Sequence, residues 1–122
     1  ILKVNKMKKI NEKKITLKGD GKQKRTFIYI NDFTNALNKV ITNGVNRSIY
    51  NIGNTDEITI MTLLKKILKL MKINCEIECS DAPIGETTRR CPDNQKIIEL
   101  GYMQEYSIEN GLKETINWYK KF

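Results

Sequence analysis

The chain has 122 residues, of which 39% are hydrophobic and 30% are charged, and its formal net charge is +8. This length suits one domain or part of one, and the composition is that of a globular protein rather than a disordered one. No apolar run approaches the roughly 18 residues of a membrane-spanning helix, and no segment reads as a secretory signal. Because the sequence opens on Ile1 inside a predicted helix, we expect it to be cut from something longer.

The positive charge comes mainly from lysine, since only four of the 22 basic residues are arginine. The lysines are spread along the chain, which is typical of a solvated surface. A nucleic-acid site would bring clustered arginines and interleaved aromatic residues. Nucleic acid is therefore not an expected partner, although a basic module that binds RNA or acidic partners without enzymatic activity stays the alternative function.

The chain contains three cysteines, Cys75, Cys79 and Cys91, and no histidine. An odd count without framework spacing favours reduced thiols and a cytoplasmic location. Zinc needs four ligands at better spacing, so no metal site is expected. The cysteines are predicted to be buried structural thiols.

The first half of the chain is predicted to run helix, strand, glycine turn and strand. The helix should cover 1–11 and the strands 14–17 and 26–30, with Gly19 and Gly21 in the turn between the strands.

A helix is expected to follow, with Asn31 or Asp32 as its N-cap and Gly44 left-handed at its end. Helical spacing predicts one inward apolar stripe on this helix, made of Phe33, Ala36, Leu37, Val40 and Ile41.

The second half should hold strands at 48–53 and 75–79, and between them a short strand that enters a helix capped by Thr59. Segment 81–92 has no period and carries both prolines, so a loop is expected there.

Two more helices are predicted near the end. Asp93 should cap the first, which stops at Gly101, and Ser107 should cap the second. The inward residues of the second would be Ile108, Leu112, Ile116 and Tyr119 or Trp118. The alternation of strands and helices predicts an α/β fold.

The residues by themselves predict no catalytic machinery. Without histidine, the commonest acid or base near neutral pH is missing, and no serine or cysteine has a matching base. "GDGKQK" is not a phosphate-binding P-loop, because Lys24 stands where that motif needs glycine. No Gly-x-x-Gly-x-x-Gly dinucleotide fingerprint occurs either.

Anion recognition remains, because Arg25 follows the glycine turn and Arg89 and Arg90 end the irregular loop. Arginine carries a rigid fork of donors that matches a phosphate group at two points. Two loops can bring Arg25 and Arg90 to opposite sides of a diphosphate. Equally, these arginines can form ordinary surface ion pairs with Asp32, Glu86 or Asp93.

Several blocks of the sequence occur in an order that resembles a known family. They are "GDGKQKRTFIYINDFTNAL", "IYNIGNTDEITI" and "ETTRRCPDNQKIIELGY", followed by "SIENGLKETINWY". Together they resemble the C-terminal part of the extended short-chain dehydrogenases, which are NAD-dependent nucleotide-sugar epimerases, dehydratases and decarboxylases. The resemblance covers nearly the whole chain.

This resemblance implies an α/β fold made of the C-terminal substrate-binding lobe and the last strand of the Rossmann sheet, without the N-terminal Rossmann core. Residues 1–122 would then be a single incomplete domain. It would bind a nucleotide-diphosphate sugar in carbohydrate biosynthesis and be inactive in isolation. The Tyr-x-x-x-Lys pair and the NAD fingerprint are absent, so the parent enzyme would use NAD but this chain alone would bind none. Expected partners are the N-terminal Rossmann domain and, in a homodimer, a second copy.

The resemblance also implies site residues. Arg25 matches the arginine that contacts the diphosphate, and Arg90, or Arg89 beside it, matches an arginine on the nucleotide-phosphate side. Three more positions match residues near the substrate, its base or its ribose: Asn51, Gln23 and Leu17. Thr26 stands where many members carry aspartate, which leaves the subfamily open, whereas the Arg-Arg-x-Pro-Asp loop resembles the epimerase and UDP-glucuronate decarboxylase branches.

Overall fold

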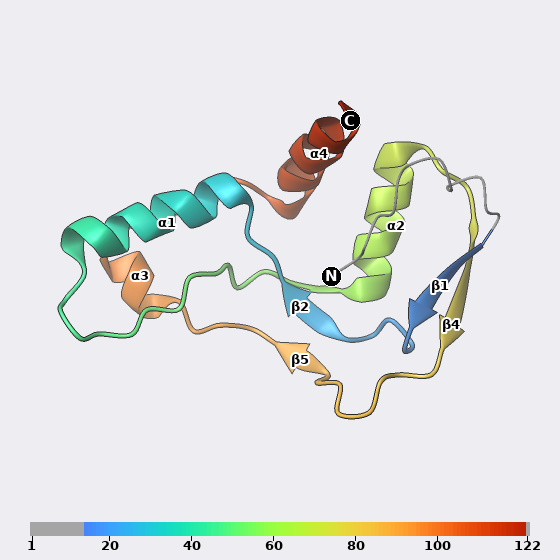
Figure 1. Ribbon diagram of the computed structural model, residues 1–122, viewed down its shortest axis with the longest axis horizontal. Coiled ribbons are helices and arrows are strands. Elements are labelled where there is room, and N and C mark those ends of the chain that lie inside the picture. The colour runs from blue at the N-terminus through green and yellow to red at the C-terminus, as the bar shows by residue number, and fades with distance from the viewer. Residues whose placement is uncertain (1–13, 122) are drawn as a thin grey trace.

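The computed structural model describes residues 14–121, in which strands and helices alternate as predicted (Figure 1). The α/β class is confirmed, while the helix predicted at 1–11 lies outside the described residues. The elements are β1 (Lys14–Lys18), β2 (Lys24–Thr26), α1 (Ile30–Asn43), β3 (Glu57–Thr59), α2 (Ile60–Met71), β4 (Glu76–Ser80), β5 (Arg89–Arg90), α3 (Gln95–Glu99) and α4 (Ile108–Tyr119).

The strands of the described segment form two small sheets. β1 and β4 make a parallel pair, and the connection between them contains α2. β2 is the middle strand of the second sheet, with β3 antiparallel on one side and β5 parallel on the other. In Figure 1, β2 and β5 lie between the β1–β4 pair with α2 on the right and helices α1 and α3 on the left.

Each side of the molecule has its own small core. On the right, Leu64 and Leu68 of α2 pack with Leu17 of β1, since the apolar stripe of α2 faces the β1–β4 pair. On the left, Ala36 of α1 packs with Ile97 of α3 and with Tyr102. The second sheet therefore lies between two packed regions, and its exposed edge at β5 is available to form a site.

Tyr102 joins the left core to the chain that leaves β2. Its hydroxyl donates to Asn54 Oδ1, and the Asn54 amide donates to the Phe27 carbonyl over 3.3 Å. Tyr102 is 3% exposed, and its burial, together with the negative charges of Asp32 and Glu105, raises its pKa to about 12.

This shift predicts a loss of stability at alkaline pH. The fold favours the neutral phenol, so the stabilisation is fully present below the pKa of about 10 that an unfolded tyrosine has. It should be lost as pH rises from about 10 to 12, by on the order of 2–3 kcal/mol. Urea unfolding followed by circular dichroism at several pH values measures this fall in the free energy of unfolding. Tyr102→Phe, which cannot ionise at this position, should show a shallower alkaline fall.

Most predicted turns and caps are confirmed. Gly19 and Gly21 take φ of 78° and 73°, which glycine adopts without steric cost. Thr59 and Ser107 accept hydrogen bonds from backbone amides three residues later, over 3.1 and 3.2 Å. At α3 the N-cap is Asn94 rather than the predicted Asp93, although the Asp93 carboxylate accepts from the Gln95 amide over 3.0 Å.

The cap predicted for α1 is wrong. The helix begins at Ile30 with Tyr29 as its N-cap, so both predicted caps, Asn31 and Asp32, lie in its first turn rather than before it. The Asp32 carboxylate is 1% exposed and accepts from the backbone amides of Glu105 and Tyr106, over 3.2 and 3.1 Å. Asp32 thus ties the first turn of α1 to the segment that leads into α4.

The inward face predicted for α1 is only partly right. Ala36 and Val40 face the left core, but Phe33, Leu37 and Ile41 are 37%, 39% and 71% exposed. On α4, Ile116 is buried as predicted, while Trp118 and Tyr119, the alternatives for its last inward residue, are both half exposed.

Four further local predictions need correction. Segment 48–53 forms no strand with any described residue, and the strand expected at 26–30 ends at Thr26 because the chain turns into α1. The segment expected to be a loop at 81–92 contains β5 near its end. Gly44 is extended, with φ −67°, rather than left-handed.

The cysteines are all free thiols, but none of them is fully buried as predicted. Cys75 packs against the right core and Cys91 is half buried, whereas Cys79 is exposed on β4. Within residues 14–121, no three or more cysteine and carboxylate side chains group into a possible metal site. None of the helices of this segment is long and apolar enough to cross a membrane.

Candidate functional site

Arg25 and Arg90, 65 residues apart in sequence, are paired across two neighbouring strands. β2 and β5 run parallel, and their register sets Lys24 opposite Arg89 and Arg25 opposite Arg90. Residues paired in this way point to the same side of a sheet, and the strands lie about 4.8 Å apart. The pairing therefore directs the side chains of Arg25 and Arg90 to the same face of the sheet.

A cleft of about 580 Å³ opens at this edge of the sheet. Its lining is strongly basic, with three arginines and no carboxylate among the described residues that form it. The lining residues are Arg25, Thr26, Arg89, Arg90, Cys91 and Pro92.

The side chain of Arg25 is 18% exposed and is fixed by loop atoms. Its Nη1 donates to the Lys24 carbonyl and its Nη2 to the Thr87 carbonyl, each over 2.8 Å. Glu86 lies further off, with 3.9 Å between Arg25 Nη2 and Glu86 Oε1. Of the alternative ion pairs, the one with Glu86 therefore forms, although it is long and leaves donors of Arg25 unused.

Arg90 is exposed and donates from Nε to the hydroxyl of Thr87 over 2.8 Å. No carboxylate of residues 14–121 lies within ion-pair distance of it. A guanidinium held through Nε keeps its terminal Nη1 and Nη2 groups available, and these donors suit a phosphate.

Arg89 also lines the cleft, but its side chain leaves the sheet on the opposite face from that of Arg90, since consecutive residues of a strand alternate. There it makes two hydrogen bonds to the carboxylate of Glu57, over 2.8 and 3.1 Å. The hydrogen bond from Arg89 and its charge lower the pKa of Glu57, and Glu57 in turn raises the pKa of Arg89. The charge of Arg89 is thus already matched.

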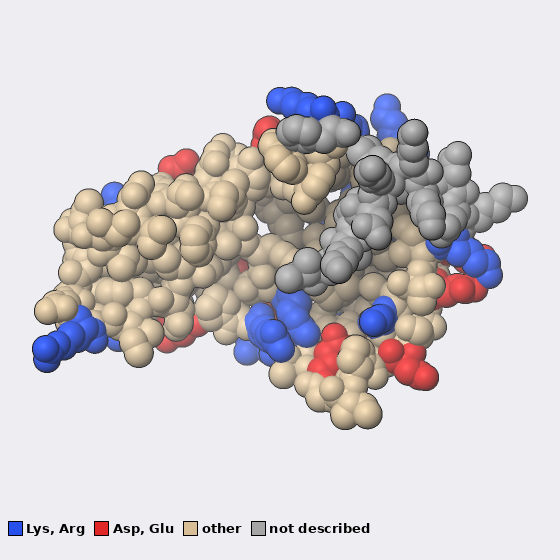
Figure 2. Space-filling view, viewed as in Figure 1, with Lys and Arg blue, Asp and Glu red and all other residues tan. Residues whose placement is uncertain are grey.

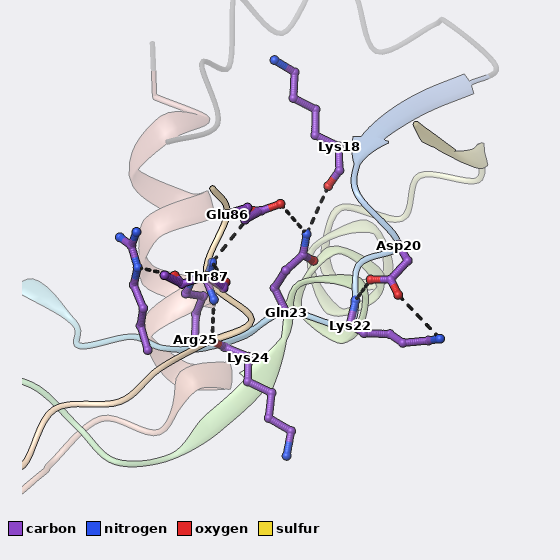
Figure 3. A network of polar contacts seen from close by, with 9 residues as sticks. Lys18, Asp20, Lys22, Gln23, Lys24, Arg25, Glu86 and Thr87 are labelled. Atoms are coloured by element: carbon purple, nitrogen blue, oxygen red, sulfur yellow. Dashed lines mark hydrogen bonds and ion pairs between the residues drawn. The ribbon is translucent and has the colours of Figure 1, made fainter. Parts of the chain in front are cut away.

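Gln23 is 8% exposed, and its amide is bound to protein atoms (Figure 3). Nε2 donates to Glu86 Oε2 over 3.0 Å and approaches the Lys18 carbonyl at 3.5 Å. These two acceptors fix the orientation of the amide, since a flipped amide would turn its oxygen toward them. Oε1 is then buried without a partner among the described atoms.

The two other predicted site residues do not line the cleft. Asn51 donates to the Asp93 carbonyl over 3.0 Å, which ties segment 48–53 to the chain that follows β5. Leu17 is 9% exposed and belongs to the right core. A direct role of either residue, or of Gln23, in binding a ligand stays a prediction.

The sequence did not single out Thr87, whose carbonyl and hydroxyl contact Arg25 and Arg90. Threonine in a loop carries no signal of its own, and its role depends on a strand pairing that segment 81–92 does not reveal.

The matching family model is the NAD dependent epimerase/dehydratase family, over residues 2–53. The chain is 34% identical over 119 residues to dTDP-D-glucose 4,6-dehydratase of Mus musculus, covering 91% of this chain and 33% of that protein. It spans about a third or less of the length of the curated relatives it matches.

Solved structures agree. A dTDP-glucose 4,6-dehydratase from Bacillus anthracis in complex with NAD is 31% identical, with a TM-score of 0.80, over 89% of this chain and 35% of that one. A UDP-glucose 4-epimerase from Thermotoga maritima with UDP-glucose is 26% identical, with a TM-score of 0.84, over 92% of this chain and 36% of that one. The fold is that of one part of these larger enzymes.

Proposed function

The chain belongs to the NAD-dependent epimerase/dehydratase family, within the extended short-chain dehydrogenases, and on this premise we propose that it binds the nucleotide-diphosphate sugar of such an enzyme. Its role is to hold the diphosphate, and with it the sugar, in place for a reaction carried out by other residues. The proposed ligand groups are the guanidinium groups of Arg25 and Arg90.

One observation carries this proposal, namely the register of β2 and β5. It sets Arg25 opposite Arg90 in a cleft whose described lining has no carboxylate. Each guanidinium can donate two parallel hydrogen bonds to phosphate oxygens, and a diphosphate offers two adjacent anionic groups. Because Arg89 is paired with Glu57, we assign it a minor part.

NAD is bound in the Bacillus anthracis relative, but the residues described here do not fit a dinucleotide site. A dinucleotide pyrophosphate sits on a glycine turn that opens a helix N-terminus. Here the turn of Gly19 and Gly21 leads into strand β2 instead. We therefore assign no redox step to this chain, and we propose that it is an incomplete domain, inactive without an NAD-binding part.

The surface of α1 gives that NAD-binding part a place to pack. Four apolar side chains form the α1 stripe, defined here as Ile30, Phe33, Leu37 and Ile41, which are 60%, 37%, 39% and 71% exposed. Their spacing along the helix sets them on one face. On the face drawn in Figure 2, charged side chains are few over the left half of the molecule and gather on the right half.

The free thiols suit a cytoplasmic enzyme.

Titration of the chain with UDP-glucose, dTDP-glucose and the matching nucleoside monophosphates tests the proposal. We expect the diphosphate sugars to bind at least about tenfold more tightly than the monophosphates, because only they reach both arginines. Isothermal titration calorimetry at two salt concentrations provides the affinities. Equal affinity for both ligand types would contradict the proposal. A steep salt dependence shared with an RNA oligonucleotide would favour the basic binding module instead.

A further inference from the structure

Thr87 contacts both arginines of the proposed site from a single position in the loop before β5. Its carbonyl oxygen accepts from Arg25 Nη2, and its Oγ1 accepts from Arg90 Nε, each over 2.8 Å. Figure 3 shows Arg25 directed at Thr87, with Glu86 beside it. We propose that Thr87 is a positioning residue, which holds the two guanidinium groups ready for the diphosphate; this inference rests on the proposed function.

The proposal assigns Thr87 a role through the arginines rather than on the ligand, because Thr87 is not among the residues that line the cleft. β5 is a two-residue strand at the edge of its sheet, and Arg90 is exposed on it. A long side chain there samples many rotamers unless a contact fixes it, and immobilising it on binding weakens affinity. The hydroxyl of Thr87 supplies that contact before any ligand arrives.

The loop that carries Thr87 is itself held to the glycine turn. The Gln23 amide donates to Glu86 Oε2 over 3.0 Å, and the backbone amide of Lys24 donates to the Thr88 carbonyl over 2.8 Å. These two contacts lie on either side of Thr87 in the sequence. The position of Thr87, and through it the spacing of Arg25 and Arg90, is therefore set by β2 and the turn before it.

The contact also selects which donors face outward. With Nε of Arg90 bound to Thr87, the remaining four N–H groups lie at the end of the side chain. Those donors can form the bidentate pair that phosphate favours. Valine at position 87 keeps the shape and the carbonyl but removes the hydroxyl, whereas serine keeps the hydroxyl, so the pair separates this contact from packing.

We expect Thr87→Val to weaken the binding of UDP-glucose or dTDP-glucose by about five- to tenfold, because one hydrogen bond to a charged group is lost. Thr87→Ser should bind within about twofold of the parent chain, since the hydroxyl is kept. Thr88→Val, next in sequence, is the matched control, because neither arginine donates to the Thr88 side chain in the described structure. Melting temperatures of the three variants should agree, which a purely structural role would not predict.

A measurement without ligand tests independently whether Thr87 orders the Arg90 side chain. The Nε–H signal of Arg90 in nitrogen-15 relaxation experiments should report a less ordered guanidinium in Thr87→Val than in the parent or in Thr87→Ser. An unchanged Arg90 signal, or Thr87→Val binding as tightly as the parent, overturns the inference. A parent chain that binds no nucleotide-diphosphate sugar overturns the proposed function instead, and the Arg90 signal still decides whether Thr87 positions the arginine.

Discussion

Replacing Arg25 or Arg90 by glutamine is expected to weaken the binding of UDP-glucose or dTDP-glucose by about 10- to 100-fold, because each guanidinium supplies charge-assisted hydrogen bonds of roughly 1.5–3 kcal/mol. Glutamine keeps much of the length of the side chain but loses the charge and the fork. The loss should fall on diphosphate ligands more than on monophosphates. Isothermal titration calorimetry on each variant measures the effect.

The chain offers a matched control for this experiment. Arg47 lies in the turn after α1 and is exposed, and it does not line the cleft. Arg47→Gln removes the same charge from the protein, so it should leave the affinity within about twofold if the effect is local rather than a matter of net charge. A similar loss for all three variants would show that bulk charge, not the Arg25–Arg90 pair, attracts the ligand.

A glutamine substitution at Arg89 should weaken ligand binding less than the same substitution at Arg25 or Arg90. Because Arg89 is paired with the Glu57 carboxylate on the other face of the sheet, Arg89→Gln should cost less than about threefold in affinity. A loss at Arg89 larger than at Arg90 would mean that the face chosen for the ligand is the wrong one.

The elements of the fold that depend on local periodicity could be predicted from the sequence. The caps at Thr59 and Ser107 require nothing beyond their own turn of chain, and the structure confirms them. The predicted inward face of α1 failed because helical spacing reveals an apolar stripe but not which part of it the rest of the chain covers.

What the sequence missed depends on contacts between distant segments. The residue type and position of Asp32 predicted a helix cap, yet its carboxylate accepts from the backbone amides of Glu105 and Tyr106, more than 70 residues away. Arg25 and Arg90 were predicted to form an anion site, but their pairing in register depends on β5, a strand of two residues inside a segment rich in loop signals. Thr87 could be assigned a role only once that pairing was known.

The α1 stripe leads to the second large expectation, that the chain on its own associates. Uncovered apolar faces of this kind are rare on stable monomers, and burying one such side chain is worth roughly 1.5–3 kcal/mol. In the proposed enzyme the NAD-binding part covers the stripe, so in its absence a second copy should do so. Sedimentation velocity of the chain at high micromolar concentration should therefore show dimers or larger species.

Introducing charge into the stripe tests whether it is the surface responsible. The double variant Leu37→Glu, Ile41→Glu should raise the dissociation constant of self-association by at least about tenfold. Two apolar side chains are then no longer buried between copies, and like charges face each other across the contact. Ile84→Glu is the matched control, since Ile84 is fully exposed in the loop between β4 and β5, away from α1. The Ile84→Glu protein should associate as the parent chain does. If the parent chain is a monodisperse monomer that unfolds cooperatively, the stripe needs no cover, and the case for an NAD-binding part packed on α1 loses its physical basis.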